Sequence, residues 1–270
     1  MNIWKNGQIV SASGALDATD RGVLLGDGIF ETLALLGGRP QFLDRHLARL
    51  SDGAKLLGIP LQTDRAGIED AIRTLAADAA VEEGAARITL LRGSGPRGVA
   101  PPAEGAPTLL VAVTAMAVGE TRPVTAVVAK STRRNERSPV SRLKTTNYLD
   151  AILASREAAG AGADDAIMLN TRDAVAEATS ANVFCVIGGD LVTPPVSDGA
   201  LPGVMRERIM VLETVIERSL TTDDLGRATE IILTSSLSVR PVTKLDGQPV
   251  GDGASGPVAT RLAGLPRRTD

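Results

Sequence analysis

The sequence predicts a two-domain α+β protein. The chain has 270 residues, enough for one large domain or two of ordinary size. Segments typical of strands and segments typical of helices are mixed in both halves, and a run of small residues at 116–123 interrupts them. We therefore expect a smaller N-terminal domain over residues 1–117, a linker over 118–123 and a larger C-terminal domain over 124–270.

The N-terminal half contains strand patterns and two helix patterns. A turn at Asn6-Gly7 joins the first two strands. One helix is expected over 45–57, with Asp44 as its N-cap and leucines on one face, and a second over 65–82. The strands are expected at 3–5, 9–10, 30–36, 87–91 and 108–114.

The C-terminal half repeats this mixture. Helices are expected over 147–159 and 204–218, and a hairpin turns at residues 188–190. The strands are expected at 124–129, 166–170, 182–187, 191–193 and 230–234.

Composition excludes several classes of protein. A net charge of −3 gives no basic field for nucleic acid or an anionic membrane, and no apolar run is long enough to span a bilayer. One cysteine and one histidine cannot form an internal disulfide or a zinc site of His and Cys ligands. We expect a cytoplasmic protein without a metal, in which His46 and Cys185 belong to the core.

Two short motifs do not carry their usual chemistry. Gly93 to Gly98 matches G-x-G-x-x-G, but Pro101-Pro102 follows where a dinucleotide-binding helix would have to run. Ser141 to Lys144 matches S-x-x-K, but the accompanying S-D-N and K-T-G motifs are missing. The glycine-rich loop still carries Arg92 and Arg97, which suit a substrate carboxylate.

Four other segments together suit pyridoxal phosphate. Lys144 lies where two elements meet, so its amine is suited to Schiff-base chemistry. Glu177 lies among small apolar residues and needs a partner. Residues 201–203 precede a helix whose N-terminus can bind phosphate, and Thr234-Ser235-Ser236 supplies hydroxyls. An amine, a carboxylate and a phosphate-binding site are what this cofactor requires.

In this order the motifs resemble those of the class IV, or fold type IV, pyridoxal-phosphate family. This family includes branched-chain and D-amino-acid aminotransferases and 4-amino-4-deoxychorismate lyase. The resemblance covers nearly the whole chain and rests on residues 26–32, 46–50, 144–148, 177–184 and 201–206.

The resemblance implies a role for individual residues. Lys144 corresponds to the Schiff-base lysine, Glu177 to the carboxylate on the pyridine nitrogen, and Arg49 to the phosphate-binding arginine. Tyr148 corresponds to the tyrosine near the phenolic oxygen of the cofactor. The phosphate and substrate contacts correspond to the backbone N–H groups of Val204 and Met205 and to the hydroxyls of Ser235 and Ser236. The resemblance also implies a site between the two domains and a homodimer.

The shared residues do not separate a lyase from a transaminase. The loop with Arg92 and Arg97 resembles that of aminodeoxychorismate lyases, and two arginines suit a dicarboxylate. We therefore expect a lyase that releases pyruvate and forms p-aminobenzoate for folate synthesis. The segment 144–148 departs from some lyases. The alternatives are a D-amino-acid transaminase acting on D-alanine and 2-oxoglutarate, or a branched-chain or amine transaminase. An inactive binding protein would show a damaged set of core residues, whereas Lys144, Glu177 and Arg49 are present.

Overall fold

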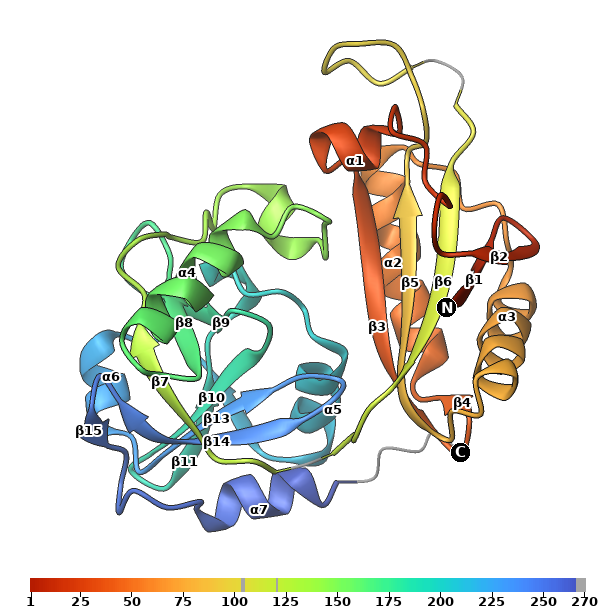
Figure 1. Ribbon diagram of the computed structural model, residues 1–270. Helices are drawn as coiled ribbons and strands as arrows, with labels where there is room; N and C mark the ends of the chain where they lie inside the picture. The colour runs from red at the N-terminus through yellow and green to blue at the C-terminus, as the bar shows by residue number, and fades with distance from the viewer. Residues whose placement is uncertain (103–104, 120, 266–270) are drawn as a thin grey trace. The chain divides into compact units, whose positions relative to one another are not determined.

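The chain forms two compact units (Figure 1). The structure is a computed structural model, and it describes residues 1–102, 105–119 and 121–265. The first unit contains residues 1–118 together with the short segment 143–147, and the second contains the remaining described residues. Both units mix helices and strands, which confirms the α+β fold class.

The first unit is built on an antiparallel sheet of six strands. Their order is β2-β1-β6-β5-β3-β4, and every neighbouring pair is antiparallel. The strands are β1 (Asn2–Lys5), β2 (Gln8–Ser11), β3 (Gly28–Leu36), β4 (Arg39–Pro40), β5 (Glu83–Leu91) and β6 (Thr108–Ala115). The expected turn at Asn6-Gly7 joins β1 to β2.

Two helices pack their apolar residues against this sheet. Helix α2 (Leu43–Leu57) buries Leu50, and helix α3 (Arg65–Asp78) buries Ile68 and Ile72, in one cluster with strand residues such as Leu33. A short helix, α1 (Arg21–Leu25), precedes β3. Side chains alternate between the two faces of a sheet along each strand. Phe30 of β3 and Arg87 of β5 therefore lie on the face opposite these helices.

The predicted limits of both helices need correction. Helix α2 begins at Leu43 rather than residue 45. Its N-cap is Phe42, which has a φ of 53°, and Asp44, the predicted N-cap, lies in the first turn. Helix α3 ends at Asp78 rather than residue 82, because Ala80 has a positive φ of 50° and the chain then enters β5.

The segment 143–147 pairs with the first unit. The Phe30 N–H donates to the Lys144 carbonyl at 2.8 Å, and the Thr146 N–H donates to the Gly28 carbonyl at 2.9 Å. Ile29 and Thr145 form an isolated antiparallel bridge between these bonds. Lys144 therefore lies beside β3, more than one hundred residues away in the sequence.

The second unit is built on a mixed sheet of nine strands. Their order is β12-β11-β10-β13-β14-β7-β8-β9, and β15 pairs with β14. The strands are β7 (Val124–Val128), β8 (Asp165–Leu169), β9 (Val175–Ala178), β10 (Asn182–Ile187), β11 (Asp190–Thr193), β12 (Val215–Glu217), β13 (Glu230–Thr234), β14 (Val239–Leu245) and β15 (Gln248–Pro249).

Four helices accompany this sheet. Helix α4 (Leu149–Gly160) packs through Ala154 and Ala158 on β8, and helix α6 (Thr222–Arg227) has a capping box. Helices α5 (Val204–Leu212) and α7 (Pro257–Ala263) share a cluster with alternate residues of β10 and β13. This cluster defines the sheet face on which α5 begins.

The predicted helix 204–218 is too long. Helix α5 ends at Leu212, because Glu213 adopts an extended conformation, and Val215–Glu217 forms strand β12 beside β11. The β-branched residues Thr214, Val215 and Ile216 favour the strand.

Candidate active site

In the first unit, the predicted Schiff-base lysine lies beside an aromatic ring. The Nζ atom of Lys144 is 4.7 Å from the centre of the Phe30 ring, and its side chain is half-buried. The guanidinium of Arg87 contacts the same ring, with its central carbon 3.6 Å from the ring centre. Backbone pairing with β3 fixes the position from which the lysine side chain extends. The sequence analysis gave no role to Phe30 or Arg87.

A buried ionic group lies between β3 and α2. The Glu31 carboxylate accepts hydrogen bonds from Arg49 Nε at 2.8 Å, from Arg49 Nη2 at 2.6 Å and from His46 Nδ1 at 2.6 Å. Glu31 is 1% exposed and His46 is fully buried. Arg49, the predicted phosphate-binding arginine, is therefore oriented by a bidentate ion pair.

The protonation of this group follows from burial and charge. Burial alone would raise the pKa of Glu31, but the hydrogen bonds and charges of Arg49 and His46 outweigh it and hold the pKa below its ordinary value. Burial lowers the pKa of His46 and outweighs the opposing hydrogen bond from Glu31; the positive charges of Arg49 and Lys144 lower it further. A neutral His46 then carries its proton on Nδ1, toward the ionised carboxylate.

Glu31 is a functional candidate that the sequence analysis missed. A single acidic residue inside the apolar strand Ile29 to Leu36 was the available signal, because a buried carboxylate requires a cationic partner. The expected core position of His46 is confirmed, as is that of Cys185, whose pKa burial raises to about 12.

Arg92 and Arg97, the predicted substrate arginines, differ in their surroundings. Arg92 donates from Nε to Asp27 at 2.6 Å, and its two terminal nitrogens donate to the carbonyls of Leu57 and Gly58 at 2.8 and 3.1 Å. Its guanidinium thus binds the C-terminus of α2, where a cation is favoured. Arg97 lies exposed on the loop.

In the second unit, Glu177 is held by a cation and a backbone donor. Its carboxylate forms an ion pair with Arg134 Nε at 3.0 Å and accepts a hydrogen bond from the Leu201 N–H at 2.9 Å. Arg134 also donates to the carbonyl of Ser141 at 2.7 Å. These donors stabilise an ionised carboxylate. Arg134 is a further residue that the sequence analysis missed.

Helix α5 begins with backbone donors that no side chain caps. Its N-cap is Gly203, and the N–H groups of the first turn, including Val204 and Met205, have no acceptor within the helix. The Asn182 side chain donates to the Leu201 carbonyl at 2.8 Å, and a Cβ atom on Gly203 would lie 1.9 Å from Asn182 Oδ1. Glycine at this position therefore permits the close approach of the two segments.

A buried hydroxyl lies on the same sheet face. Thr234 is directly opposite Asn182 in the β10–β13 register, so both side chains lie on the α5 side of the sheet. Thr234 is 1% exposed, and its Oγ1 has no hydrogen-bond partner among the described residues. A buried hydroxyl without a partner costs about 1–3 kcal/mol, so an anion bound here would satisfy it.

The hydroxyl predicted for phosphate binding, that of Ser235, already has partners. Its Oγ accepts from the N–H groups of Leu237 and Ser238 at 3.2 Å each. Ser236 is half-buried, as is Tyr148, which directly precedes α4. Because these bonds use only the acceptor side of the Ser235 hydroxyl, its O–H can still donate to an anion, as can that of Thr234.

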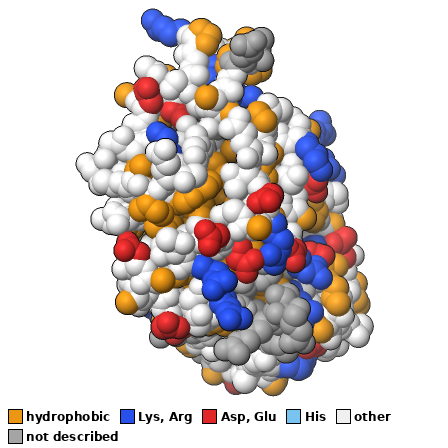
Figure 2. Space-filling view, turned by 90° about the vertical axis from the view of Figure 1, so that its right-hand side faces the viewer, with side chains coloured by type: hydrophobic (Ala, Val, Ile, Leu, Met, Phe, Trp, Pro, Cys, Tyr) orange, Lys and Arg blue, Asp and Glu red, His pale blue; other side chains and the backbone are white. Residues whose placement is uncertain are grey.

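Positively and negatively charged side chains lie next to one another on the surface: Figure 2 shows lysine and arginine side chains beside acidic ones on the face that it presents. No three histidine, cysteine or acidic side chains gather around a possible metal position in the part of the chain that the structure describes. Within the same residues, no helix is long and apolar enough to cross a membrane.

The residues present fit a phosphorylated cofactor with a basic ring nitrogen. The uncapped start of α5 and the Thr234 hydroxyl suit its phosphate, Glu177 suits its ring nitrogen, and Lys144 suits its aldehyde carbon. Each unit, taken by itself, therefore offers groups of the kind that pyridoxal phosphate requires.

Comparison with known proteins gives the family. Residues 28–245 match the family described as amino-transferase class IV, and the chain belongs to this family. Its cofactor is pyridoxal phosphate; one similar structure, a branched-chain aminotransferase, contains N-(5'-phosphopyridoxyl)-L-glutamate.

Several relatives are similar over nearly their whole length. The D-alanine aminotransferase of Bacillus licheniformis is 31% identical, over 97% of this chain and 94% of its own. The branched-chain aminotransferase structure from Escherichia coli has a TM-score of 0.90 and 26% identity, and covers 97% of this chain and 91% of its own. A Legionella pneumophila structure, provisionally assigned as a 4-amino-4-deoxychorismate lyase, has a TM-score of 0.83 and 32% identity, covering 92% of each chain.

Proposed function

We propose that the protein is an aminotransferase that moves an amino group from an amino acid to a 2-oxo acid. The observation that carries this proposal is the full-length similarity to aminotransferases for branched-chain amino acids and for D-alanine. The proposed aminotransferase replaces the lyase that the sequence of the glycine-rich loop suggested.

The position of Arg92 supports the change. The lyase interpretation used Arg92 and Arg97 to bind a dicarboxylate. In the structure, however, the Nε, Nη1 and Nη2 atoms of Arg92 donate to Asp27 and to the carbonyls at the end of α2. Arg87 is a better candidate for a substrate carboxylate, since it contacts the same Phe30 ring as Lys144.

In this proposal, individual residues of the chain have distinct roles. Bound pyridoxal phosphate supplies a ring that withdraws electrons from the reacting carbon. The Lys144 amine moves the proton at the substrate carbon that bears nitrogen. Glu177, which pairs with Arg134, would contact the ring nitrogen and favour its protonated form. In the second unit, the start of α5 and Thr234 would donate to the phosphate. In the first unit, Glu31 orients Arg49, the proposed phosphate-binding arginine.

The second candidate function is 4-amino-4-deoxychorismate lyase. The Legionella pneumophila structure, 32% identical, favours it specifically. Lys144 would perform the same proton transfer, and pyruvate would leave as the ring becomes aromatic to give p-aminobenzoate.

One experiment compares the two functions. Purified protein loaded with cofactor is given D-alanine or L-leucine with 2-oxoglutarate, and separately aminodeoxychorismate, with Lys144→Ala as the control. Formation of glutamate that depends on Lys144 supports the aminotransferase. Formation of p-aminobenzoate that depends on Lys144, without glutamate, would refute it in favour of the lyase.

We also propose a homodimer in the cytoplasm. Leu149, Ile152 and Leu153 are 67%, 51% and 45% exposed on one side of α4, where a second copy would bury them. The buried free thiol of Cys185 suits a reducing compartment. Light scattering of the purified protein tests the dimer.

A further inference from the structure

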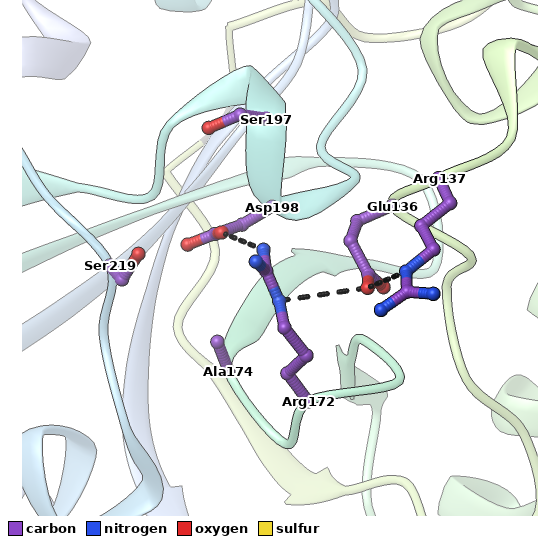
Figure 3. Close-up of a pocket in the computed structure, with 7 residues that line it drawn as sticks. All are labelled: Glu136, Arg137, Arg172, Ala174, Ser197, Asp198 and Ser219. Atoms are coloured by element: carbon purple, nitrogen blue, oxygen red, sulfur yellow. Dashed lines mark hydrogen bonds and ion pairs between the residues drawn. The ribbon is translucent and has the colours of Figure 1, made fainter.

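A pocket in the second unit involves none of the residues assigned above. Its volume is about 420 Å³, within the range of small-molecule sites of about 300–1,000 Å³. Four segments line it: the chain after β7, the β8–β9 turn, the short 3-10 helix Val196–Asp198 and the chain before α6. The lining residues are Glu136, Arg137, Arg172, Ala174, Ser197, Asp198 and Ser219 (Figure 3).

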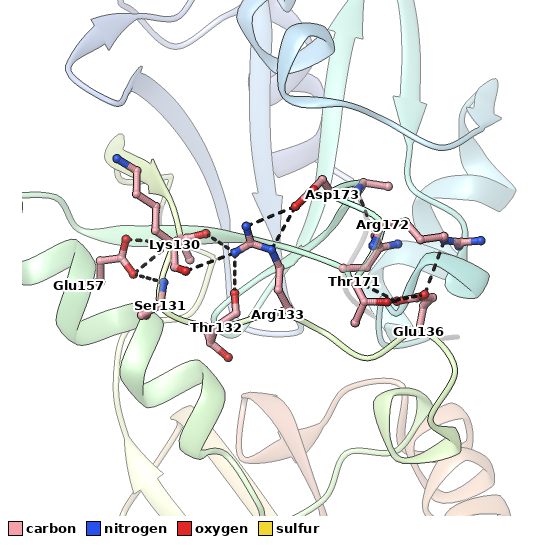
Figure 4. A network of polar contacts seen from close by, with 12 residues as sticks. Lys130, Ser131, Thr132, Arg133, Glu136, Glu157, Thr171, Arg172 and Asp173 are labelled. Carbon is pink, nitrogen blue, oxygen red and sulfur yellow. Dashed lines mark hydrogen bonds and ion pairs between the residues drawn. The ribbon is translucent and has the colours of Figure 1, made fainter.

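One arginine connects the two acids of this pocket. Arg172 donates from Nη2 to Asp198 Oδ1 at 2.9 Å, and its Nε lies 3.6 Å from Glu136 Oε1. Glu136 is further held by Thr171, whose hydroxyl and N–H donate to its two oxygens at 2.8 and 3.1 Å (Figure 4). Glu136 is therefore fixed in place.

Asp198 keeps one oxygen without a partner. The residue is 2% exposed, and Oδ2 has no hydrogen-bond partner among the described residues. In Figure 3 this oxygen lies on the side of the carboxylate away from Arg172, toward Ser219. A buried carboxylate oxygen without a donor is costly, so a ligand that brings a cationic N–H donor would be bound preferentially.

The other side of the pocket offers positive charge. The side chains of Arg137 and Arg172 are 85% and 56% exposed, so both can turn toward a ligand. Two arginines and two acids balance in charge, which favours a ligand that is neutral overall but carries separated charges. Among the described residues that line the pocket, two are acidic, Glu136 and Asp198. A metal site built from carboxylates requires more ligands than these two.

We propose that this pocket binds a free α-amino acid, separately from the substrate that reacts at Lys144. The ammonium group takes the place of Arg172 at Asp198, aided by the Ser197 and Ser219 hydroxyls. The carboxylate binds the released Arg172 together with Arg137. This exchange satisfies both oxygens of Asp198 and leaves no charge unpaired.

The pocket is connected to Glu177 through the chain. Gly199, next to Asp198, accepts a hydrogen bond from Arg134 through its carbonyl, and Leu201 donates to the Glu177 carboxylate. Arg134 itself pairs with Glu177 and lies two residues before Glu136. An amino acid bound at Asp198 would therefore lie beside the segment that holds Glu177.

The test uses holoenzyme reduced with borohydride, which fixes the cofactor on its lysine so that amino acids cannot react. Glycine and both alanine enantiomers are titrated by calorimetry into wild type, Asp198→Asn and, as a matched control, Asp190→Asn, an exposed aspartate of the same unit. Ethylamine and propionate serve as ligands that carry only one of the two charges.

We expect saturable binding to wild type and to Asp190→Asn, and affinity about tenfold or more weaker in Asp198→Asn. Arg137→Ala, which changes an exposed side chain, is expected to weaken amino-acid binding but not ethylamine binding. Absence of binding to wild type, equal affinity in Asp198→Asn, or ethylamine binding as tight as alanine would overturn the proposal.

Discussion

Removal of the Glu31 carboxylate charge tests how much the buried ionic group contributes to the free energy of unfolding. In Glu31→Gln, Arg49 and His46 lose an anionic partner that they contact at 2.6 to 2.8 Å, and whose side chain is 1% exposed. Breaking a buried ion pair costs about 3–5 kcal/mol, because the remaining charge is left without compensation. We expect a loss of this size in the free energy of unfolding.

The matched control is Glu69→Gln on α3. Glu69 pairs with Arg65 at 2.6 Å, the same distance, but the two side chains are 35% and 53% exposed. An exposed pair contributes about 0–1 kcal/mol. Urea unfolding followed by fluorescence of Trp4, the only tryptophan, reports on the first unit, where both acids lie. Equal losses in the two variants would refute the role of burial.

Three further outcomes are expected. Thr234→Val should weaken binding of pyridoxal phosphate about tenfold, as equilibrium dialysis measures, without loss of stability, because an unpartnered buried hydroxyl is removed; unchanged affinity would exclude Thr234 from the phosphate site. Arg134→Met should slow turnover about tenfold or more by leaving Glu177 without its cation, and normal turnover would contradict this. Burial lowers the pKa of His46, so its contribution to stability is present above the unfolded pKa of about 6.5 and is lost as the pH drops below it, because only the unfolded chain then takes up the proton. His46→Gln should remove this pH dependence. Its persistence in the variant would show that another group is responsible.

Local sequence patterns predicted most of the elements. Alternation and β-branched residues located β3 and β13 to within two residues, because such strands bury one or both faces. The same patterns failed where a short strand follows a helix without a glycine or proline between them, as in α5 and β12. Local patterns did not locate helix α7, because its seven residues give little periodicity.

Contacts between distant residues were beyond local patterns. The sequence placed Arg92 in a loop suited to a carboxylate, but its partners Asp27 and Leu57 lie 65 and 35 residues away. Likewise, Glu177 was expected to need a partner, and only the fold identifies Arg134. Three adjacent hydroxyls in 234–236 look alike in sequence, and burial and hydrogen bonding distinguish Thr234 from Ser235.

The most direct measurement locates the residue that carries the cofactor. Protein loaded with pyridoxal phosphate is reduced with borohydride, digested and analysed by mass spectrometry. We predict a phosphopyridoxyl group on the peptide that contains Lys144 and on no other lysine. Modification of a different lysine, or persistence of the covalent cofactor in Lys144→Ala, would contradict the assignment of Lys144.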